Sequence, residues 1–361
     1  MPSTCAPTHL TFFTPAAPPG QQVSLVAVKG TKTILVSAYQ EHRTGRREVS
    51  EEGRPPIVPR FTPRGAKYGK RVVYVHSDHF GFVYGTADIM CSLPSGCESP
   101  SHITVTSKAD SEEKPDHMYL AVKNKKTESD SFHYNFTVCI STMFDFNNVL
   151  QVIPWTLSRF LNVSRGWLPE HGPGEIHYFG QIPVLHDCLY RYMYQSRYVA
   201  LHDIDELILP QSLLPLLEKK YGAQQCFMFQ NNVFPNTVTD TRPSFLPSNW
   251  QKVPGVDILT HLYHEPVSND YSDFKTIVNP RAVFTLTVHG LLEPGTSEWL
   301  LSPLTVNVMS AVCLCRPPKQ PKLTEDKLIH DDRLLSYGAR FTPNVSTVLR
   351  ECGLLQKDSI Q

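Results

Sequence analysis

The sequence predicts an α/β fold, in which helices flank a mixed sheet and a smaller β-rich module precedes it. Strand-like and helix-like segments alternate along the chain after residue 130, which is typical of parallel strands joined by helices. An acidic cluster also follows a run typical of a buried strand, and open α/β sheets bind their ligands at such strand ends. The 361 residues, 41% of them hydrophobic, suffice for one large domain with an appendage.

The first 130 residues are predicted to form a loose tail and the small β-rich module. Residues 1–20 are rich in Pro, Thr and Ala, which favours the tail, and the charged, Pro/Gly-rich stretch 42–70 favours a loop. The polar run Lys123–Ser131 places the end of the module, residues 21–130, near residue 130. The short β-prone runs of this module are Val23–Val28, Thr33–Tyr39, Arg71–Tyr84 and Met118–Val122.

Residues 131–361 are predicted to form the larger α/β domain. Its strands are expected at Phe136–Ile140, Glu175–Phe179, Tyr198–Leu201, Cys226–Gln230 and Val283–His289. Its helices are expected at Val149–Asn162 and from Pro183 to about Gln195, because a proline is tolerated in a first helical turn. Strand, helix and strand in this order favour parallel pairing through a right-handed crossover.

Composition excludes several classes of protein. Lys plus Arg and Asp plus Glu balance at 34 each, so the chain lacks the basic excess of a nucleic-acid binder. No apolar run approaches the roughly 20 residues of a membrane-spanning helix, and the first 20 residues lack the pattern of a signal peptide. The nine cysteines form no paired CxxC spacing, which argues against a structural zinc site. Three glycosylation sequons begin at Asn135, Asn162 and Asn344.

The acidic cluster Asp203-Ile204-Asp205-Glu206 is the candidate for chemistry. Two carboxylates at i and i+2 on an extended segment point to the same side, where they can hold a divalent cation that also binds a diphosphate. Composition alone predicts about one Asp-x-Asp triplet in such a chain. The observation that supports a functional site is therefore the buried strand predicted before the triplet. In the alternative interpretation, Asp203 or Asp205 caps the following turn and Glu206 is solvated.

Several segments resemble glycosyltransferase family 92, and together they cover most of residues 30–290 in the family's order. The central segments are Ile176–Phe179, His186–Arg191 and Tyr198–Pro210. Upstream, Thr33–Arg43 resembles the "SAY…R" stretch that opens the family's conserved region. Downstream, Lys275–Pro280 followed by Val288-His289 resembles the "K-x-I-V-x-P … H" segment.

The resemblance implies a GT-A fold and a metal-dependent, inverting glycosyltransferase of the Golgi lumen. Relatives of this kind use UDP-galactose and a divalent cation, usually Mn²⁺, to make β1,4 linkages on the glycans of glycoproteins or glycolipids. They are tethered to the membrane by an N-terminal helix, which is not found in this sequence. The sequons and cysteines suit a luminal protein in which disulfides persist.

The family's functional residues carry over to this chain as follows. The metal ligands implied are Asp203, Asp205 and His289, with Asp205 favoured as the direct ligand. The donor-binding residues implied are Asp187, Arg191, Glu206, Lys275 and Arg316. Two of these assignments have plainer alternatives: a local i,i+4 ion pair for Asp187 and Arg191, and a hydrogen-bonded histidine at a strand end for His289.

In the implied inversion, an acceptor hydroxyl attacks the anomeric carbon and a carboxylate takes its proton. The candidates for this base, between which the sequence does not choose, are Asp257, Glu265, Asp270 and Asp273. One departure from the family pattern favours a rival function: Ser310–Arg316 stands where relatives carry "HYR", and only Arg316 is retained. The rival is a catalytically silent glycan-binding paralogue. A nucleotidyltransferase or kinase ranks last, because the chain has no GxxxxGK[ST] phosphate loop.

Overall fold

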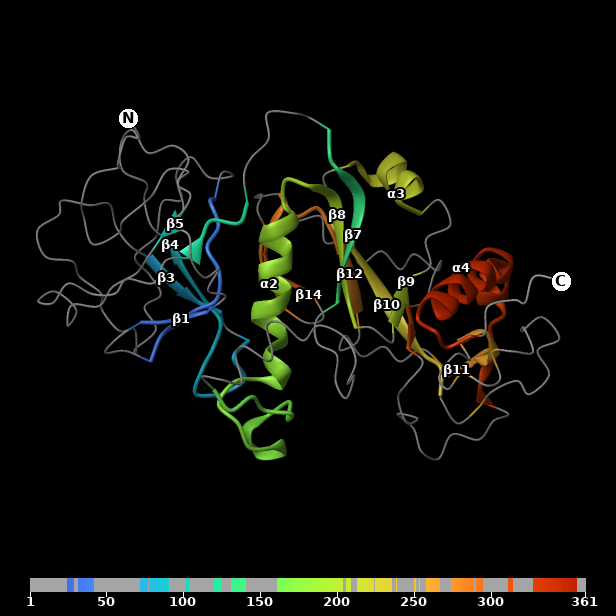
Figure 1. Cartoon of the computed structure of the whole chain (residues 1–361), viewed down its shortest axis with the longest axis horizontal. Coiled ribbons are helices and arrows are strands. Elements are labelled where there is room, and N and C mark those ends of the chain that lie inside the picture. The colour runs from blue at the N-terminus through green and yellow to red at the C-terminus, as the bar shows by residue number, and fades with distance from the viewer. Residues whose placement is uncertain are drawn as a thin grey trace, which may run out of the picture. The chain divides into compact units, whose positions relative to one another are not determined.

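The structure is a computed structural model of the chain, drawn in Figure 1, and its description is limited to the following residues. These are 25–28, 32–41, 72–76, 78–90, 102–103, 120–124, 131–140, 161–203, 206–208, 213–223, 225–235, 238, 250, 253, 258–266, 274–287, 290–294, 311–313 and 327–355. The residues group into two compact units, which are described separately. The first unit contains residues 1–203, 224–226 and 277–300, and the second contains residues 204–223, 227–276 and 301–361.

In the first unit, the described residues before 130 form three short antiparallel strand pairs. They are β1 (Val26–Ala27) with β2 (Ile34–Leu35), β3 (Val72–Val75) with β4 (Ala87–Met90), and β5 (His102–Ile103) with β6 (Leu120–Ala121). The β-rich character predicted for this part of the chain is therefore confirmed. The module boundary near residue 130 stays a prediction.

The centre of the first unit is a strand–helix–strand arrangement with the predicted parallel pairing. Strand β7 (Tyr134–Ile140) pairs with β8 (Ser196–His202) from Tyr134 opposite Ser196 to Ile140 opposite His202. Helix α2 (Gln181–Tyr192) precedes β8 and lies beside both strands in Figure 1. Strands β13 (Val283–Thr287) and β14 (Gly290–Pro294) form an antiparallel hairpin.

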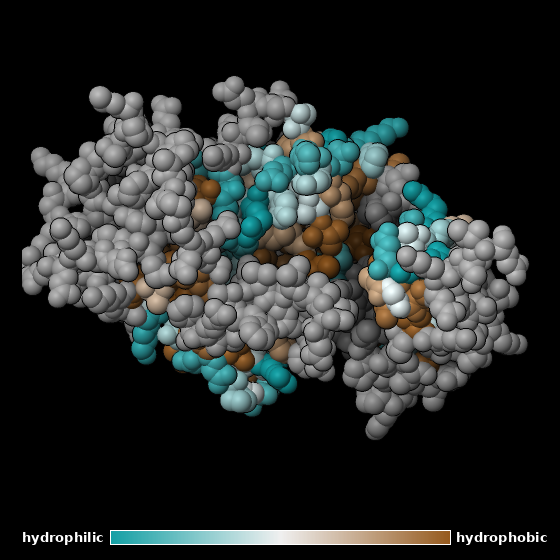
Figure 2. Space-filling model, in the orientation of Figure 1, coloured by the Kyte–Doolittle hydropathy of each residue, from teal (hydrophilic) through white to brown (hydrophobic). Residues whose placement is uncertain are grey.

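Helix α2 forms where the sequence predicts it, because its apolar residues repeat at helical spacing. Ile182, Leu185 and Leu189 are buried on one face, and Pro183 stands in the first turn, where its missing N–H costs nothing. The core cluster beneath α2 contains Cys139, Leu185, Leu189, Val199, Leu201, Val278, Val283 and Leu286. Figure 2 shows hydrophobic residues, in brown, in the region of β7 and β8, with hydrophilic residues beside them. Val138 and Ile140 of β7 are among the exposed apolar side chains of the described residues.

The connection from α2 to β8 is fastened by one arginine. The guanidinium of Arg281 donates to the carbonyl oxygens of Met193, Ser196 and Arg197, each at 2.7 Å, and it lies over the ring of Phe132. Because one rigid group binds three carbonyls around the turn, the turn fixes the direction in which β8 starts.

The second unit contains a mixed sheet, so the predicted α/β class with a mixed sheet is confirmed. Its strands follow the order β10 (Phe227–Val233), β15 (Ala311–Cys313) and β9 (Glu206–Ile208), of which the first pair is parallel and the second antiparallel. The other elements are α3 (Leu213–Tyr221), η5 (Ile258–Thr260), the pair β11 (Tyr263–His264) and β16 (Ile329–His330), η8 (Arg333–Tyr337) and α4 (Gly338–Glu351). Trp250, Val253, Leu349 and Leu355 form its core cluster, and strand β12 (Phe274–Val278) crosses from the second unit into the first.

One predicted strand is wrong, and one predicted helix lies almost entirely outside the described residues. Glu175–Phe179 is not a strand: after a single bridge residue, Ile176, the chain enters the 3-10 turn η3 (Tyr178–Gly180). Tyr178 and Phe179 have positive φ angles, which an extended strand does not have. Of the predicted helix 149–162, only Leu161 and Asn162 are described, and they are not helical. A second 3-10 turn, η2 (Pro169–His171), lies between them and η3.

Among the described residues, no helix has the length and apolar character needed to cross a membrane.

Candidate active site

Asp203 stands directly after the last residue of β8, where the sequence predicts the site. Its carboxylate is half-buried, and its Oδ1 accepts a hydrogen bond from the side-chain amide of Gln181 at 2.8 Å. Gln181 is the first residue of α2, and its side chain is buried. The beginning of α2 therefore lies at the carboxyl end of β8, which places the positive end of the helix dipole beside the first aspartate of the cluster.

The turn that delivers Gln181 has an unusual backbone. Tyr178, Phe179 and Gly180 have φ angles of 25°, 56° and 67°, so three successive residues occupy left-handed conformations. This is inexpensive only for Gly180, and non-glycine residues in such conformations cost about 1–3 kcal/mol each. Strain of this size persists only where surrounding contacts impose it.

Those contacts form an aromatic cluster around His177, the residue before the turn. The ring of Phe80 stacks on His177 at 4.2 Å, and Trp167 and Phe82 meet its ring edge-on at 4.7 and 5.7 Å. Among the described residues, neither ring nitrogen of His177 has a hydrogen-bond partner. Burial lowers the pKa of His177 to about 4, so the imidazole is neutral at pH 7.

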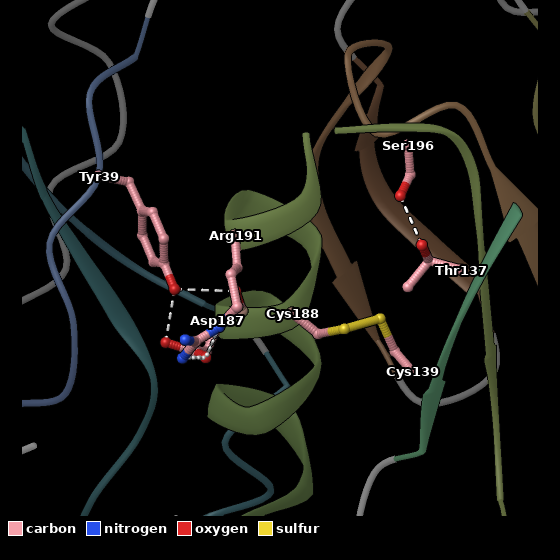
Figure 3. Close-up of a disulfide and its surroundings, with 7 residues drawn as sticks. All are labelled: Tyr39, Thr137, Cys139, Asp187, Cys188, Arg191 and Ser196. Carbon is pink, nitrogen blue, oxygen red and sulfur yellow. Dashed lines mark hydrogen bonds and ion pairs between the residues drawn. A yellow bond between two sulfur atoms is a disulfide. The ribbon is translucent and has the colours of Figure 1, made fainter. Parts of the chain in front are cut away.

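Asp187, on the same helix, is a buried carboxylate that joins three parts of the first unit (Figure 3). Its Oδ1 accepts from the Tyr39 hydroxyl at 2.5 Å and from the Lys123 ammonium at 2.9 Å. Its Oδ2 accepts from Arg191 Nη2 at 2.5 Å, so the i,i+4 ion pair considered from the sequence is present. Burial would raise the pKa of Asp187, but Lys123, the Tyr39 hydroxyl and Arg191 outweigh it and hold the pKa below its usual range.

The residues on both sides of Asp187 anchor α2 elsewhere. Cys188 forms a disulfide with Cys139 of β7, which Figure 3 shows beside the Asp187 contacts. His186 Nδ1 lies 2.9 Å from the Ile182 carbonyl oxygen, and its Nε2 lies 3.2 Å from the backbone N–H of Leu286 in β13. If Nε2 accepts from that N–H, Nδ1 must carry the proton. Three consecutive residues thus attach one helix to β13, to the N-terminal strands and to β7.

Replacing Asp187 with asparagine is expected to destabilise the protein by about 2 kcal/mol at pH 7. The change leaves two cations without their carboxylate, and the loss is smaller than for a fully buried pair because Lys123 and Arg191 reach solvent. Because the folded pKa is depressed, the stability contributed by Asp187 is present above its unfolded pKa and is lost as pH falls below about 4. Urea unfolding at pH 7 and pH 3.5 measures both effects. The control Asp332→Asn, at an exposed position, should change little, and an equal loss in both variants would contradict this role of Asp187.

The lowered pKa of His186 predicts a second loss of stability on acidification, at higher pH than the loss expected from Asp187. Burial, together with His76, lowers the pKa of His186 to about 4, so between pH 6.5 and 4 the unfolded chain binds a proton that the folded chain does not. The free energy of unfolding should therefore fall by about 3 kcal/mol across that window. Denaturation midpoints from pH 7 to 4 measure the slope, which His186→Asn should reduce and the exposed control His171→Asn should not. A slope unchanged in His186→Asn would show that other groups cause it.

In the second unit, the backbone of Glu206 lies in β9 opposite Cys313 of β15. One residue of the segment that departs from the family pattern, Cys313, therefore pairs with the last residue of the acidic cluster. Lys275 of β12 is 1% exposed, and Glu265, after β11, is 5% exposed and donates its backbone N–H to the Val233 carbonyl. Glu265 is the one candidate base among the described residues.

The remaining predicted site residues lie outside the described residues. They are Asp205, His289 and Arg316, with the candidate bases Asp257, Asp270 and Asp273. Their roles stay predictions. Within the part of the chain that is described, no cluster of three or more His, Cys, Asp or Glu side chains is placed to hold a metal. Asp203 is a hard oxygen donor of the type that suits Mn²⁺ or Mg²⁺.

The three sequon asparagines, Asn135, Asn162 and Asn344, are all exposed, whereas their hydroxyl residues are held by the fold. Thr137 bonds to Ser196, Ser164 bonds to Gly166 and Gly172, and Ser346 accepts from the indole N–H of Trp250. Each asparagine is therefore placed where a glycan would extend into solvent.

Sequence reasoning missed Gln181, His177 and Lys123 as residues around the site. A glutamine at the start of a helix, a histidine four residues before it and a lysine in a polar run carry no local signal of chemistry. The proline two residues after Gln181 was the available clue, because it marks the helix start that faces the acidic strand end.

Residues 148–295 match the family model described as glycosyltransferase family 92, a range that contains α2, β8 and the acidic cluster. No curated protein matches the chain. The α/β fold, the acidic strand end and the family match together indicate a glycosyltransferase. The match over residues 148–295 supports the resemblance to glycosyltransferase family 92 seen in the sequence.

Proposed function

We propose that the protein is a metal-dependent, inverting glycosyltransferase that moves galactose from UDP-galactose to a glycan in β1,4 linkage. One observation carries the proposal: Asp203 ends a buried strand inside the family region, and the first residue of a firmly anchored helix is hydrogen-bonded to it. This is the end of the sheet where α/β enzymes bind nucleotides.

The proposed roles follow from the chemistry of the side chains. Asp203, Asp205 and His289 hold a divalent cation, which when bound supplies positive charge for the departing UDP. Lys275, Arg316 and Glu206 contact the donor. Asp187 and Arg191 support the donor pocket through α2, because the carboxylate of Asp187 is buried and bound to three partners. A carboxylate among Asp257, Glu265, Asp270 and Asp273 accepts the proton of the acceptor hydroxyl.

The proposed location is the Golgi lumen, with association to its membrane. The Cys139–Cys188 disulfide and the three exposed sequon asparagines support it, since disulfides persist in oxidising compartments and N-glycans are added in the secretory pathway. The acceptor is then a glycan on a glycoprotein or glycolipid.

A catalytically silent glycan-binding paralogue is the second candidate. The observation that favours it is the altered segment at Cys313, which pairs with Glu206 of the acidic cluster. Such a protein would bind glycan without needing Mn²⁺ or UDP-galactose.

The test measures transfer to a panel of β-galactose- and fucose-terminated glycans, with UDP-galactose, UDP-glucose and UDP-N-acetylgalactosamine as competing donors. We expect a product from UDP-galactose, and its sensitivity to a β1,4-specific galactosidase reports the linkage. Another preferred donor would refute the galactose assignment while leaving the class intact. Glycan binding with no transfer from any donor would favour the silent paralogue.

A further inference from the structure

The hydrogen bond between Gln181 and Asp203 supports the location of the proposed site, but the proposed chemistry assigns no role to Gln181 itself. Gln181 is 2% exposed, stands at the first position of α2 and donates its amide N–H to Asp203 Oδ1 at 2.8 Å. Asp203 is half-buried at the carboxyl end of β8. The bond thus joins the start of the helix to the end of the strand that carries the acidic cluster.

The position of Gln181 is fixed from both directions along the chain. On its carboxyl side, α2 is attached by the Cys188 disulfide, by the His186 contact to β13 and by the Asp187 contacts. With a rise of 1.5 Å per residue, these anchors lie within about 11 Å of Gln181 along the helix axis. On its amino side, Gln181 follows the left-handed turn Tyr178–Gly180. This turn comes directly after His177, whose ring packs against aromatic rings.

An amide suits this position for electrostatic reasons. A lysine or arginine would hold the carboxylate equally well, but its charge would repel a cation bound to Asp203. An amide N–H orients the carboxylate without adding charge, and hydrogen bonds of this kind to metal-binding residues typically change metal affinity by about 10- to 100-fold when they are removed.

We propose that Gln181 is a positioning residue that orients the carboxylate of Asp203 toward the divalent cation of the active site. The inference rests on the proposed function, since it requires that Asp203 bind the metal. The strained turn before Gln181 then has a function, because it places the Gln181 side chain at the carboxyl end of β8.

Two substitutions at Gln181 distinguish the effect of its amide N–H from the effect of its side-chain volume. Gln181→Met keeps the length and apolar stem but removes the donor, and Gln181→Asn keeps the donor but withdraws it by one methylene. Mn²⁺ binding to the purified, metal-free chain, followed by the electron paramagnetic resonance signal of free Mn²⁺, measures the effect without turnover. Both variants should bind Mn²⁺ about tenfold more weakly than the unmodified chain. The matched control Gln195→Met, at an exposed position after α2, should bind it normally.

The outcomes distinguish a failure of the role proposed for Gln181 from a failure of the proposed function on which that role rests. Unchanged Mn²⁺ binding in both variants, with the unmodified chain binding Mn²⁺, would overturn the role of Gln181 and leave the proposed function intact. A chain that binds no Mn²⁺, with or without UDP, would remove the proposed function itself. Urea unfolding accompanies each titration. If both variants lost the fold, Gln181 would be a residue of the core rather than a positioning residue, and the inference would fail.

Discussion

Replacing Asp205 with alanine is expected to lower the rate of galactose transfer by about a thousandfold. A metal that neutralises a leaving diphosphate contributes several kcal/mol to transition-state stabilisation, and each 1.4 kcal/mol is a factor of ten in rate. Asp203→Asn should act in the same direction, because an amide is a poorer ligand than a carboxylate for a hard cation. UDP release from UDP-galactose, measured with Mn²⁺ and an acceptor, reports the rate.

The stability of these variants shows whether a loss of activity comes from the loss of a metal ligand or from unfolding. A metal ligand at a strand end contributes little to the core, so the free energy of unfolding of Asp205→Ala should stay within about 1 kcal/mol of the unmodified chain. Asp332→Ala, at an exposed position outside the family region, is the control and should keep full activity. If Asp205→Ala unfolded, or if it kept full activity, the metal assignment would be wrong.

Removing the Cys139–Cys188 disulfide is expected to have the largest effect on stability. The bond closes a loop with a sequence separation of 49 residues, for which the chain-entropy model gives a loss of about 4 kcal/mol. It also attaches α2 to β7, and both cysteines contact the apolar core of the first unit. The double change Cys139→Ala and Cys188→Ala should therefore lower the midpoint of urea unfolding clearly.

The described residues supply a matched control for the disulfide. Cys352 is a free, exposed cysteine, so Cys352→Ala should leave the midpoint unchanged. Reduction of the unmodified chain should reproduce the loss seen in the double variant and should add nothing to that variant. If reduction destabilised both proteins equally, another bond would be responsible.

The sequence predicts those elements whose hydrophobic spacing is local. Ile182, Leu185 and Leu189 mark α2, and the run Tyr198–Leu201 marks β8, because burial of one face or of a whole strand leaves its period in the sequence. Glu175–Phe179 also contains β-prone residues, yet the chain turns left-handed there, where Phe80 and Trp167 pack on His177. Such tertiary packing has no signature in a short segment.

In the candidate site, too, local spacing predicts some contacts, whereas contacts between distant parts of the chain are not predicted. The i,i+4 spacing predicted the ion pair of Asp187 with Arg191, and the strand end predicted the place of Asp203. The partners Tyr39 and Lys123 are 148 and 64 residues away from Asp187, so no spacing rule reaches them. Pairing among nine cysteines is likewise undetermined by sequence, since many connectivities are possible.

The described segments before residue 130 have a physical role in this arrangement. Tyr39 and Lys123 bind Asp187, and the ring of His76 lies 4.5 Å from that of His186. These contacts hold α2, whose first residue contacts Asp203. These segments thus hold in place the helix whose first residue binds Asp203.

The central claim is that this chain transfers a sugar from a nucleotide donor with the help of a metal bound at Asp203 and Asp205. Its most direct test is release of UDP from UDP-galactose by the purified chain, with and without Mn²⁺ and a glycan acceptor. The account predicts that UDP is released only with Mn²⁺, that the acceptor raises the rate, and that Asp205→Ala removes the signal. Glycan binding with no release of UDP under any of these conditions would contradict it.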